Sequence, residues 1–513
     1  MVCLHPYLLS KKSKTKMQFF ENDFYGILPE LFLLGASLTL LMFGVIYSSS
    51  PVFGTPSLMK ITSWLSILSL ILTLGLVVNN SMPSMVLCTQ NLFIDSFTDF
   101  FKLLILVGSI ISILVSFQYF KTEKMANFEY LILILLSTLS MMLLVSSYDL
   151  ISMYLAVEMQ SLCFYVLAAS QRDSEFSTEA GLKYFLLGAF SSGIFLLGCS
   201  LLYGLTGLTN FEAFSMFFAQ MEQVNQAKEW MFIQLALIFI LVGFFFKLSA
   251  APFHFWAPDV YEGSPTSVTA FFSIVPKISI FGILIKLFFV SFYELAVLWQ
   301  PLLIASGILS LFVGAFGAFA QKKIKRLLVY SSIGHLGFMF LGLSCLTIEG
   351  LQSMLSYLVF YILMTIQVFA CILSLKDVSS GQRIRYLEDL KYLYQSHPLL
   401  GLSFILNFFS MAGIPPLVGF CAKFYVFFAA LGSSLYFFVF MALLSSIVSC
   451  FYYLRFIKFI YFHRSSSCSV NYLPMDEQKA WVISVSSFLL VYLFFSPSFV
   501  FLLAEKVAYA LIA

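Results

Sequence analysis

The sequence contains very little charge. Only 10% of its residues are Asp, Glu, Lys or Arg, whereas soluble domains carry about 25%. A soluble fold of this size would lack the polar residues needed to cover its surface. Apolar runs of about 18 residues or more recur along the whole chain, as is typical of membrane-spanning helices. We therefore predict an all-α, polytopic membrane protein.

The sequence also lacks the common motifs for metals and nucleotides. Its nine cysteines include no C-x-x-C pair, and most of them lie in apolar runs. This spacing excludes an iron–sulfur cluster or zinc site of ordinary kind. A glycine-rich phosphate loop and a dinucleotide fingerprint are missing as well. We expect no metal and no redox cofactor in this chain.

The apolar runs predict fourteen transmembrane helices. The seventh and twelfth are long and contain helix breakers, so we interpret both as discontinuous. The breakers are Pro252 and Pro258 in the seventh helix, and Gly413, Pro415, Pro416 and Gly419 in the twelfth. The predicted ranges are 27–47, 58–78, 101–120, 128–147, 150–170, 181–204, 231–262, 265–290, 297–320, 326–346, 350–375, 397–430, 434–457 and 480–503.

The basic residues are distributed unevenly among the loops. Sixteen lie in loops after odd-numbered helices, and three lie after even-numbered helices or at the C-terminus, namely Lys102, Lys228 and Lys506. Basic loops face the interior, so the odd-numbered loops are predicted to face the matrix or cytoplasm. Four lysines of the N-terminal extension do not fit this bias: Lys11, Lys12, Lys14 and Lys16.

Five lysines remain, and all fall within predicted spans. They are Lys183, Lys247, Lys277, Lys286 and Lys423. Glu158 is the acid that lies well inside a span. A charge at the bilayer centre costs ~2.5–3.5 kcal/mol on insertion scales, so it usually faces a partner or a wet cavity. One acid cannot neutralise five lysines, and burial helps a lysine to give up its proton. This pattern favours a proton relay.

A purely structural role is the alternative to a relay role for some of these residues. Lys286 lies near the end of its helix and is expected to extend its ammonium to the membrane surface. Lys183, near the start of the sixth helix, could do the same or form a structural pair. Glu158 could be a structural counter-ion only. The three deeper lysines are expected to belong to the relay.

Two histidines are further candidates. His335 lies in the tenth helix, and His254 lies beside the break in the seventh. Imidazole titrates in the physiological range and can shuttle protons. We take His335 as a relay residue and His254 as a possible one, with a hydrogen-bonded core histidine as the alternative for both.

The helix order predicts an inverted repeat. Helices four to eight (128–290) and nine to thirteen (297–457) form two five-helix units, and an odd number of helices inverts the second. The broken helix is the fourth of each unit, which is typical of an ion site in a transporter. Lys247 precedes the first break, and Lys423 follows the second. The remaining parts are an N-terminal extension (1–26), three N-terminal helices (27–127) and a loop with a C-terminal helix (458–513).

Five stretches of this sequence together resemble one family. They are "KLSAAPFHFWAPDVYEGSPTSVTAFFSIVPKISIF", "YLAVEMQSLCFYVLAAS", "STEAGLKYFLLGAFSSG", "KRLLVYSSIGHLGFMFLG" and "AGIPPLVGFCAKFYVFFAALG". They resemble the antiporter-like subunit 2 of mitochondrial NADH:ubiquinone oxidoreductase, respiratory complex I, in its plant and algal form. The resemblance runs from about Phe128 to Phe459.

The resemblance implies a function and a set of residues. It implies a membrane-arm subunit that translocates protons through Glu158, Lys247, Lys277 and Lys423, with Lys183 as the sixth-helix lysine. NADH, FMN, iron–sulfur clusters and ubiquinone are then expected on other subunits. Neighbouring antiporter-like subunits and membrane lipids are the expected partners, without nucleic acid. The implied location is the mitochondrial inner membrane, with the chain encoded in the organelle.

Three other functions stay open from the sequence. A stand-alone sodium or potassium/proton antiporter would use similar broken helices and charges. A passive scaffold would suit the apolar faces but would leave the deep lysines unexplained. A quinone-reducing enzyme is the third alternative, although no redox centre is evident.

Overall fold

A computed structural model describes residues 5–48, 55–80, 84–123, 127–221, 227–376, 383–391, 393–462 and 474–512. Within these residues, thirteen helices are long and apolar enough to cross a membrane. Two shorter apolar helices, α15 (Pro398–Ala412) and α16 (Val418–Gly432), lie one after the other and supply a further crossing. A bilayer offers the backbone no hydrogen-bond partners, so these apolar runs satisfy their own amides and carbonyls as helices. The predicted all-α membrane fold is confirmed.

The N-terminal part contains three helices and a small hairpin. The helices are α1 (His5–Ser48), α2 (Thr55–Asn79) and α3 (Ser96–Thr122). Strands β1 (Met85–Leu87) and β2 (Leu92–Ile94) form an antiparallel hairpin before α3. Because α1 already begins at His5, the predicted extension 1–26 is largely continuous with the first helix. The side chains of its four lysines lie outside the described residues.

Two sets of helices follow in the predicted order. The first set is α4 (Glu129–Ser146), α5 (Leu150–Ala168), α6 (Glu175–Thr206), α8 (Ala227–Leu248), α9 (Trp256–Gly263) and α10 (Thr266–Lys286), with α7 (Phe211–Met221) inserted after α6. The second set is α11 (Ala296–Phe319), α12 (Ile324–Ser344), α13 (Ile348–Ser374), α14 (Leu393–Ser396), α15, α16 and α17 (Tyr436–Tyr461). The chain ends with α18 (Glu477–Phe495) and α19 (Ser498–Ile512).

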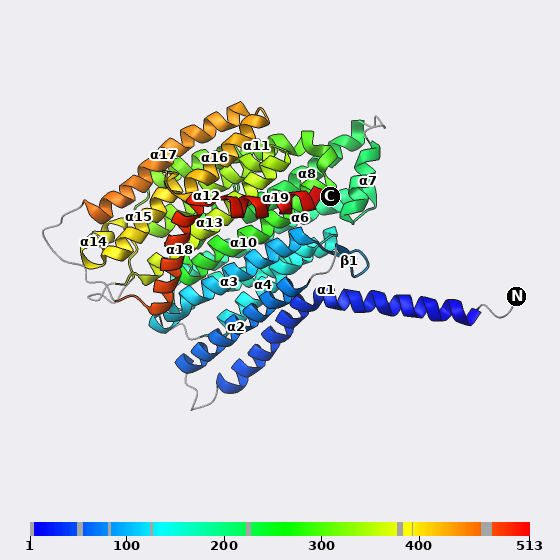
Figure 1. Cartoon of the computed structure of the whole chain (residues 1–513), viewed down its shortest axis with the longest axis horizontal. Coiled ribbons are helices and arrows are strands. Elements are labelled where there is room, and N and C mark those ends of the chain that lie inside the picture. The colour runs from blue at the N-terminus through cyan, green and yellow to red at the C-terminus, as the bar shows by residue number, and fades with distance from the viewer. Residues whose placement is uncertain are drawn as a thin grey trace.

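The loops gather at two opposite ends of the helix bundle. The β1–β2 hairpin, α7 and the C-terminus lie at one end, and α14 lies at the other (Figure 1). Isolated β-bridges join loops that lie at the same end. At the first end, Asp149 pairs with Asn210, and both follow even-numbered predicted helices. At the second end, Lys323 pairs with Tyr386, and both follow odd-numbered ones. This separation agrees with the helix count from which the charge bias was read.

Helix α10 occupies the centre of the bundle. Every one of its residues is buried, and it packs against α3, α4 and α13. Helices α12 and α13 are also buried along most of their length. Polar side chains on these three helices therefore face protein, and each needs a partner inside the bundle.

The two predicted breaks are present, but two residues were wrongly taken as breakers. The first break runs from 249 to 255 and contains Pro252, whereas Pro258 lies in the first turn of α9, where the missing amide is tolerated. The second break runs from 413 to 417, and Gly419 lies inside α16. The first interruption therefore begins earlier in the chain than its predicted breakers, and the second is shorter than the sequence suggested.

The structure also differs from the sequence prediction outside the two units. The predicted last helix, 480–503, is two helices that meet at Ser496 and Pro497, because proline cannot donate the amide that would continue α18. Helix α7 was not predicted. Its Phe211, Phe214 and Phe218 are buried at helical spacing, which holds it against the bundle.

Candidate proton-relay site

The centre of the site is a contact between Lys277 and Tyr361. Lys277 lies on α10 and donates a hydrogen bond from Nζ to the Tyr361 hydroxyl on α13, at 2.9 Å. The ammonium also lies 4.9 Å from the centre of the Tyr361 ring. The Tyr361 hydroxyl in turn lies 3.4 Å from the Ser273 carbonyl oxygen. Among the described residues, this buried lysine is held by a phenol and by no acid, so it can exchange a proton with a neutral partner.

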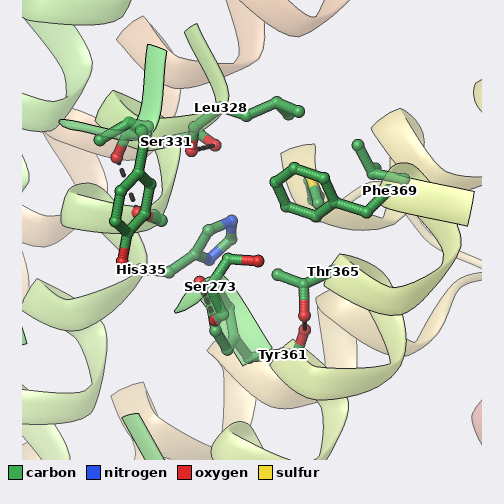
Figure 2. A pocket seen from close by; sticks show the side chains of 12 residues that line it. Ser273, Leu328, Ser331, His335, Tyr361, Thr365 and Phe369 are labelled. Atoms are coloured by element: carbon green, nitrogen blue, oxygen red, sulfur yellow. Dashed lines mark hydrogen bonds between the residues drawn. The ribbon is translucent and has the colours of Figure 1, made fainter. Parts of the chain in front are cut away.

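His335 forms the next polar group along the bundle. Its Nδ1 lies 2.7 Å from the Tyr357 hydroxyl, and its Nε2 lies 3.3 Å from the Tyr453 hydroxyl. The His335 ring centre is 5.6 Å from that of Tyr361. Figure 2 shows the His335 ring close to Tyr361 and Ser273, in a cavity that Thr365 also lines. Both ring nitrogens have a hydroxyl partner, so the imidazole can take up a proton on one side and release one on the other.

Lys423 reaches into the second break. It lies on α16 and donates from Nζ to the carbonyl oxygens of Met411 and Ala412, at 3.0 and 2.9 Å. These are the last carbonyls of α15, which lack helix partners and carry the negative end of the helix dipole. Gly413 allows this approach: its φ is +87°, and a Cβ there would lie 3.0 Å from Lys423 Cδ. The break therefore provides a hydrogen-bonding site for the buried Lys423 ammonium.

Lys247 lies at the first break in a different state. It is in the last turn of α8, and its Nζ is buried without a hydrogen-bond partner among the described residues. The nearest aromatic ring is that of Tyr165, with its centre 5.9 Å away. The Trp256 indole donates to the Phe246 carbonyl at 2.9 Å and ties α9 back to α8. Lys247 and Lys423 thus both lie near the C-terminal end of a half-helix, α8 and α15 respectively. Of the two, only Lys423 donates hydrogen bonds to the free carbonyls of that end.

Glu158 lies near Lys247 without touching it. One carboxylate oxygen accepts from the Ser161 hydroxyl at 3.3 Å, and the other is buried without a partner in the described part of the chain. Among the described residues, Glu158 forms no ion pair within 4 Å with Lys183 or Lys247. The acid and the lysine thus each have one buried polar atom without a partner in the described part of the chain.

Two candidate residues, Lys183 and His254, lie apart from Glu158, Lys247, Lys277, His335 and Lys423. Lys183 is 43% exposed and forms ion pairs with Glu179 at 2.6 Å and Asp259 at 3.3 Å. The structural pair that the sequence left open for Lys183 is therefore what the structure contains. His254 is buried beside Phe255, and its Nδ1 has no partner in the described segments. Neither residue touches Glu158 or the three deep lysines by any hydrogen bond or ion pair in the described part of the chain.

Three small cavities connect the relay residues. The first lies between Lys247 and Lys277, the second between Tyr361 and His335, and the third between His335 and Lys423. The volumes that the centre of a water molecule can occupy in them are about 20, 10 and 10 Å³. A cavity needs roughly 10–15 Å³ of such volume to hold one water. Each gap between relay residues can therefore hold about one water, which would complete a hydrogen-bonded line across both units.

Several buried charges were misplaced by sequence reasoning. Lys102, expected in a loop, is buried in α3 and forms an ion pair with Glu30 on α1 at 2.7 Å. Lys286, expected at the membrane surface, is buried and donates to the Val145 carbonyl at 3.3 Å. Lys479, also expected in a loop, is buried in the first turn of α18 and pairs with Asp476 at 2.8 Å. Each stands within a few residues of a helix end, where sequence boundaries are least certain.

The partners of the relay residues were also missed. Tyr357, Tyr361 and Tyr453 contact Lys277 or His335, yet they are three among the 26 tyrosines of the chain. A tyrosine in an apolar helix is ordinary, so the sequence carried no signal that singles them out. In the described residues, no group of three or more His, Cys, Asp or Glu side chains could hold a metal ion.

Comparison with known proteins places this arrangement in a family. Residues 147–449 match the family described as NADH:quinone oxidoreductase/Mrp antiporter, TM. The chain is 48% identical over 493 residues to NADH-ubiquinone oxidoreductase chain 2 of Marchantia polymorpha, covering 96% of this chain and 99% of the relative. It is 42% identical over 471 residues to NADH-quinone oxidoreductase subunit N of Paramagnetospirillum magneticum, covering 91% and 94%.

The fold agrees with a solved structure of the same family. A chain of respiratory complex I from Thermus thermophilus with bound aureothin superposes with a TM-score of 0.75 at 31% identity, covering 93% of this chain and 99% of that one. The resemblance read from the five sequence stretches is confirmed by these relatives. The chain belongs to the NADH:quinone oxidoreductase/Mrp antiporter family of membrane proteins.

Proposed function

We propose that this chain is the antiporter-like subunit 2 in the membrane arm of a respiratory NADH:ubiquinone oxidoreductase. It translocates protons across the mitochondrial inner membrane, coupled to NADH oxidation and quinone reduction on other subunits. The observation that carries the proposal is the line of buried titratable groups from Lys247 through Lys277 and His335 to Lys423, spaced by water-sized cavities. Such groups are costly inside a membrane, and they are typical of proton pathways.

The redox chemistry is assigned to other subunits of the complex. NADH, FMN, iron–sulfur clusters and ubiquinone are expected there, and neighbouring membrane-arm subunits and lipids are the partners of this chain. The support is the naming of the relatives as single chains or subunits of an oxidoreductase. The mitochondrial location and organelle encoding follow the plant relatives, among them chain 2 of Arabidopsis thaliana.

The first step of the mechanism is a change in the charge pair of Glu158. Quinone reduction elsewhere drives charge rearrangement along the membrane arm, which closes or opens the pair between Glu158 and its lysine. Lys247 suits this role better than Lys183, because Lys183 is already held by Glu179 and Asp259. Closing the pair holds a proton on Lys247, and opening it removes that support and releases the proton.

The next steps carry the proton across both units. From Lys247 the proton passes through the first cavity to Lys277, and Tyr361 relays it toward the cavity beside His335. The third cavity leads from His335 to Lys423. The proton leaves toward the side that faces the loops after even-numbered helices. Each transfer then spans one hydrogen bond or one water.

The test is the proton-to-electron ratio of the assembled complex in sealed vesicles. In Lys247→Ala, we expect NADH oxidation with an artificial acceptor to persist while proton pumping falls. Unchanged pumping by a fully assembled variant would make the broken helix structural and would favour the scaffold alternative. A strict requirement for sodium or potassium ions in the same vesicles would favour a cation/proton antiporter instead.

A further inference from the structure

A second cavity lies at the interior end of the bundle, away from the relay. It has a volume of about 370 Å³, within the range of roughly 300–1,000 Å³ that is usual for ligand pockets. Five connections that follow odd-numbered predicted helices meet around it: those after α3, α5, α9, α11 and α13. Its charged lining is Glu123, Glu262, Lys323, Lys325, Arg383 and Arg385.

The charged lining has more cations than acids. Four basic side chains face two acidic ones, and both acids are already engaged. Glu123 pairs with Arg383 at 2.7 Å, and Glu262 pairs with Lys323. Lys325 donates to a backbone carbonyl only, that of Ser264 at 2.8 Å. The Arg385 side chain forms no ion pair with any described residue, so two positive charges are left without a counter-ion.

The cavity also contains unused hydrogen-bond donors. The hydroxyls of Ser264 and Thr266 line it, are at least nine-tenths buried, and have no partner among the described residues. Buried hydroxyls are nearly always hydrogen-bonded, so both can donate to a molecule in the cavity. The Arg383 guanidinium is engaged elsewhere: it donates to Glu123 at 2.7 Å and to the Leu373 carbonyl at 3.3 Å, and its carbon lies 3.9 Å from the centre of the Tyr119 ring. It therefore neutralises Glu123 and leaves the charges of Lys325 and Arg385 to an occupant of the cavity.

We propose that this cavity is a binding site for a phosphate group. Lys325 and Arg385 supply the charge, and the hydroxyls of Ser264 and Thr266 donate to the phosphate oxygens. Arginine forks match phosphate geometry, and basic pockets between helices on the interior side suit phospholipid headgroups. Phe176 lines the same cavity and is 65% exposed, so an acyl chain could leave the site over an apolar side chain. The phosphate comes from an anionic lipid of the inner leaflet or from the solution.

The test uses the assembled complex and a photoreactive phosphatidylglycerol in bilayer discs. Cross-linked peptides are mapped by mass spectrometry, with attention to residues 383–391 and the start of α6. In Lys325→Gln and in Arg385→Gln, we expect labelling to fall roughly tenfold, the effect of one charge-assisted hydrogen bond. Lys322→Gln is the matched control, because Lys322 is an exposed lysine of the same connection that does not line the cavity.

The two sources of phosphate give different results. Lipid labelling that inorganic phosphate displaces poorly identifies a headgroup site. Direct binding of inorganic phosphate that depends on Lys325 and Arg385, without lipid labelling, identifies a soluble phosphate. The proposal is wrong if neither substitution changes lipid labelling or phosphate binding, or if phosphatidylcholine labels the cavity as strongly as phosphatidylglycerol. If Lys325→Gln fails to assemble, Arg385→Gln still decides, since its side chain is exposed.

Discussion

Lys277 and Tyr361 join the two five-helix units by a hydrogen bond of 2.9 Å. Lys277 belongs to the last helix of the first unit, and Tyr361 belongs to the third helix of the second. On one side of this contact lies the cavity shared with Lys247, and on the other lies the cavity shared with His335. The Tyr361 hydroxyl therefore lies where a proton would pass between the two units, and Tyr261 lines both cavities as well.

Substitution Tyr361→Phe is expected to uncouple the units. It keeps the ring and removes the hydroxyl, which deletes one hydrogen bond to a charged group, worth about 1.5–3 kcal/mol. The proton-to-electron ratio in sealed vesicles should fall, while NADH oxidation with an artificial acceptor should stay normal.

The control for this substitution is Tyr148→Phe. Tyr148 is also buried, and it packs against Phe93 and Phe211 without touching the relay. Its variant should pump protons normally. If Tyr361→Phe pumps as well as Tyr148→Phe, then water alone bridges Lys277 and His335, and Tyr361 has only a packing role.

Two buried lysines on α10 are expected to behave differently. Lys277→Met should abolish proton transfer through this chain, because methionine cannot carry a proton between the first two cavities. Lys286→Met should leave pumping intact: Lys286 contacts the Val145 carbonyl and the rings of Phe93 and Tyr148, and it lines none of the three relay cavities. Methionine is similar in size to lysine, and Lys286 forms no ion pair with any described residue, so this substitution leaves no opposite charge stranded.

The measurement is the initial rate of vesicle acidification per NADH oxidised, compared at equal amounts of assembled complex. Equal losses in Lys277→Met and Lys286→Met would show that any buried charge on α10 matters. That result would contradict the assignment of proton transfer to Lys277 in particular.

Substitution Gly413→Ala should displace the Lys423 ammonium from the carbonyls of Met411 and Ala412. A left-handed backbone costs a residue with a Cβ roughly 1–2 kcal/mol, and the new methyl group would press on the Lys423 side chain. We expect a lower thermal stability of the complex together with weaker pumping. Gly432→Ala, at the end of α16, is the control because a Cβ there meets no atom within 4 Å. Normal pumping in Gly413→Ala would mean that the carbonyls of Met411 and Ala412 are dispensable to Lys423.

The helices and the burial of the deep lysines could be predicted because the membrane leaves few alternatives. An apolar run in a membrane must form a helix. Proline weakens a helix, and the chain is interrupted at Pro252 and Pro415, although Pro276 and Pro301 lie inside the continuous helices α10 and α11. A lysine such as Lys277 stands out because its neighbours are apolar and its burial is costly. The chemistry of the line was therefore visible in the residue types and in their order along the chain.

The geometry of the site could not be predicted in the same way. Which tyrosine meets Lys277 depends on the rotation of α13 against α10, and periodicity fixes only which faces are apolar. The ion pair of Lys183 with Asp259 of α9 was not predicted either, because Asp259 comes within reach only once the first break turns the chain. Likewise, Lys102 and Glu30 pair across 72 positions of the sequence, a separation over which helical periodicity says nothing.

The Lys102–Glu30 pair leads to the last prediction. Both side chains are nearly fully buried, and they join α1 to α3. Removing one partner strands the other charge, which costs about 3–5 kcal/mol, whereas replacing both with apolar side chains is often neutral or better. We expect Glu30→Leu and Lys102→Met each to reduce the amount of assembled complex, and the double variant to restore it. Lys102→Met alone assembling normally would mean that Glu30 is satisfied without it. Loss of pumping in an assembled double variant would instead give this pair a part in proton transfer, and the relay would extend into the N-terminal helices.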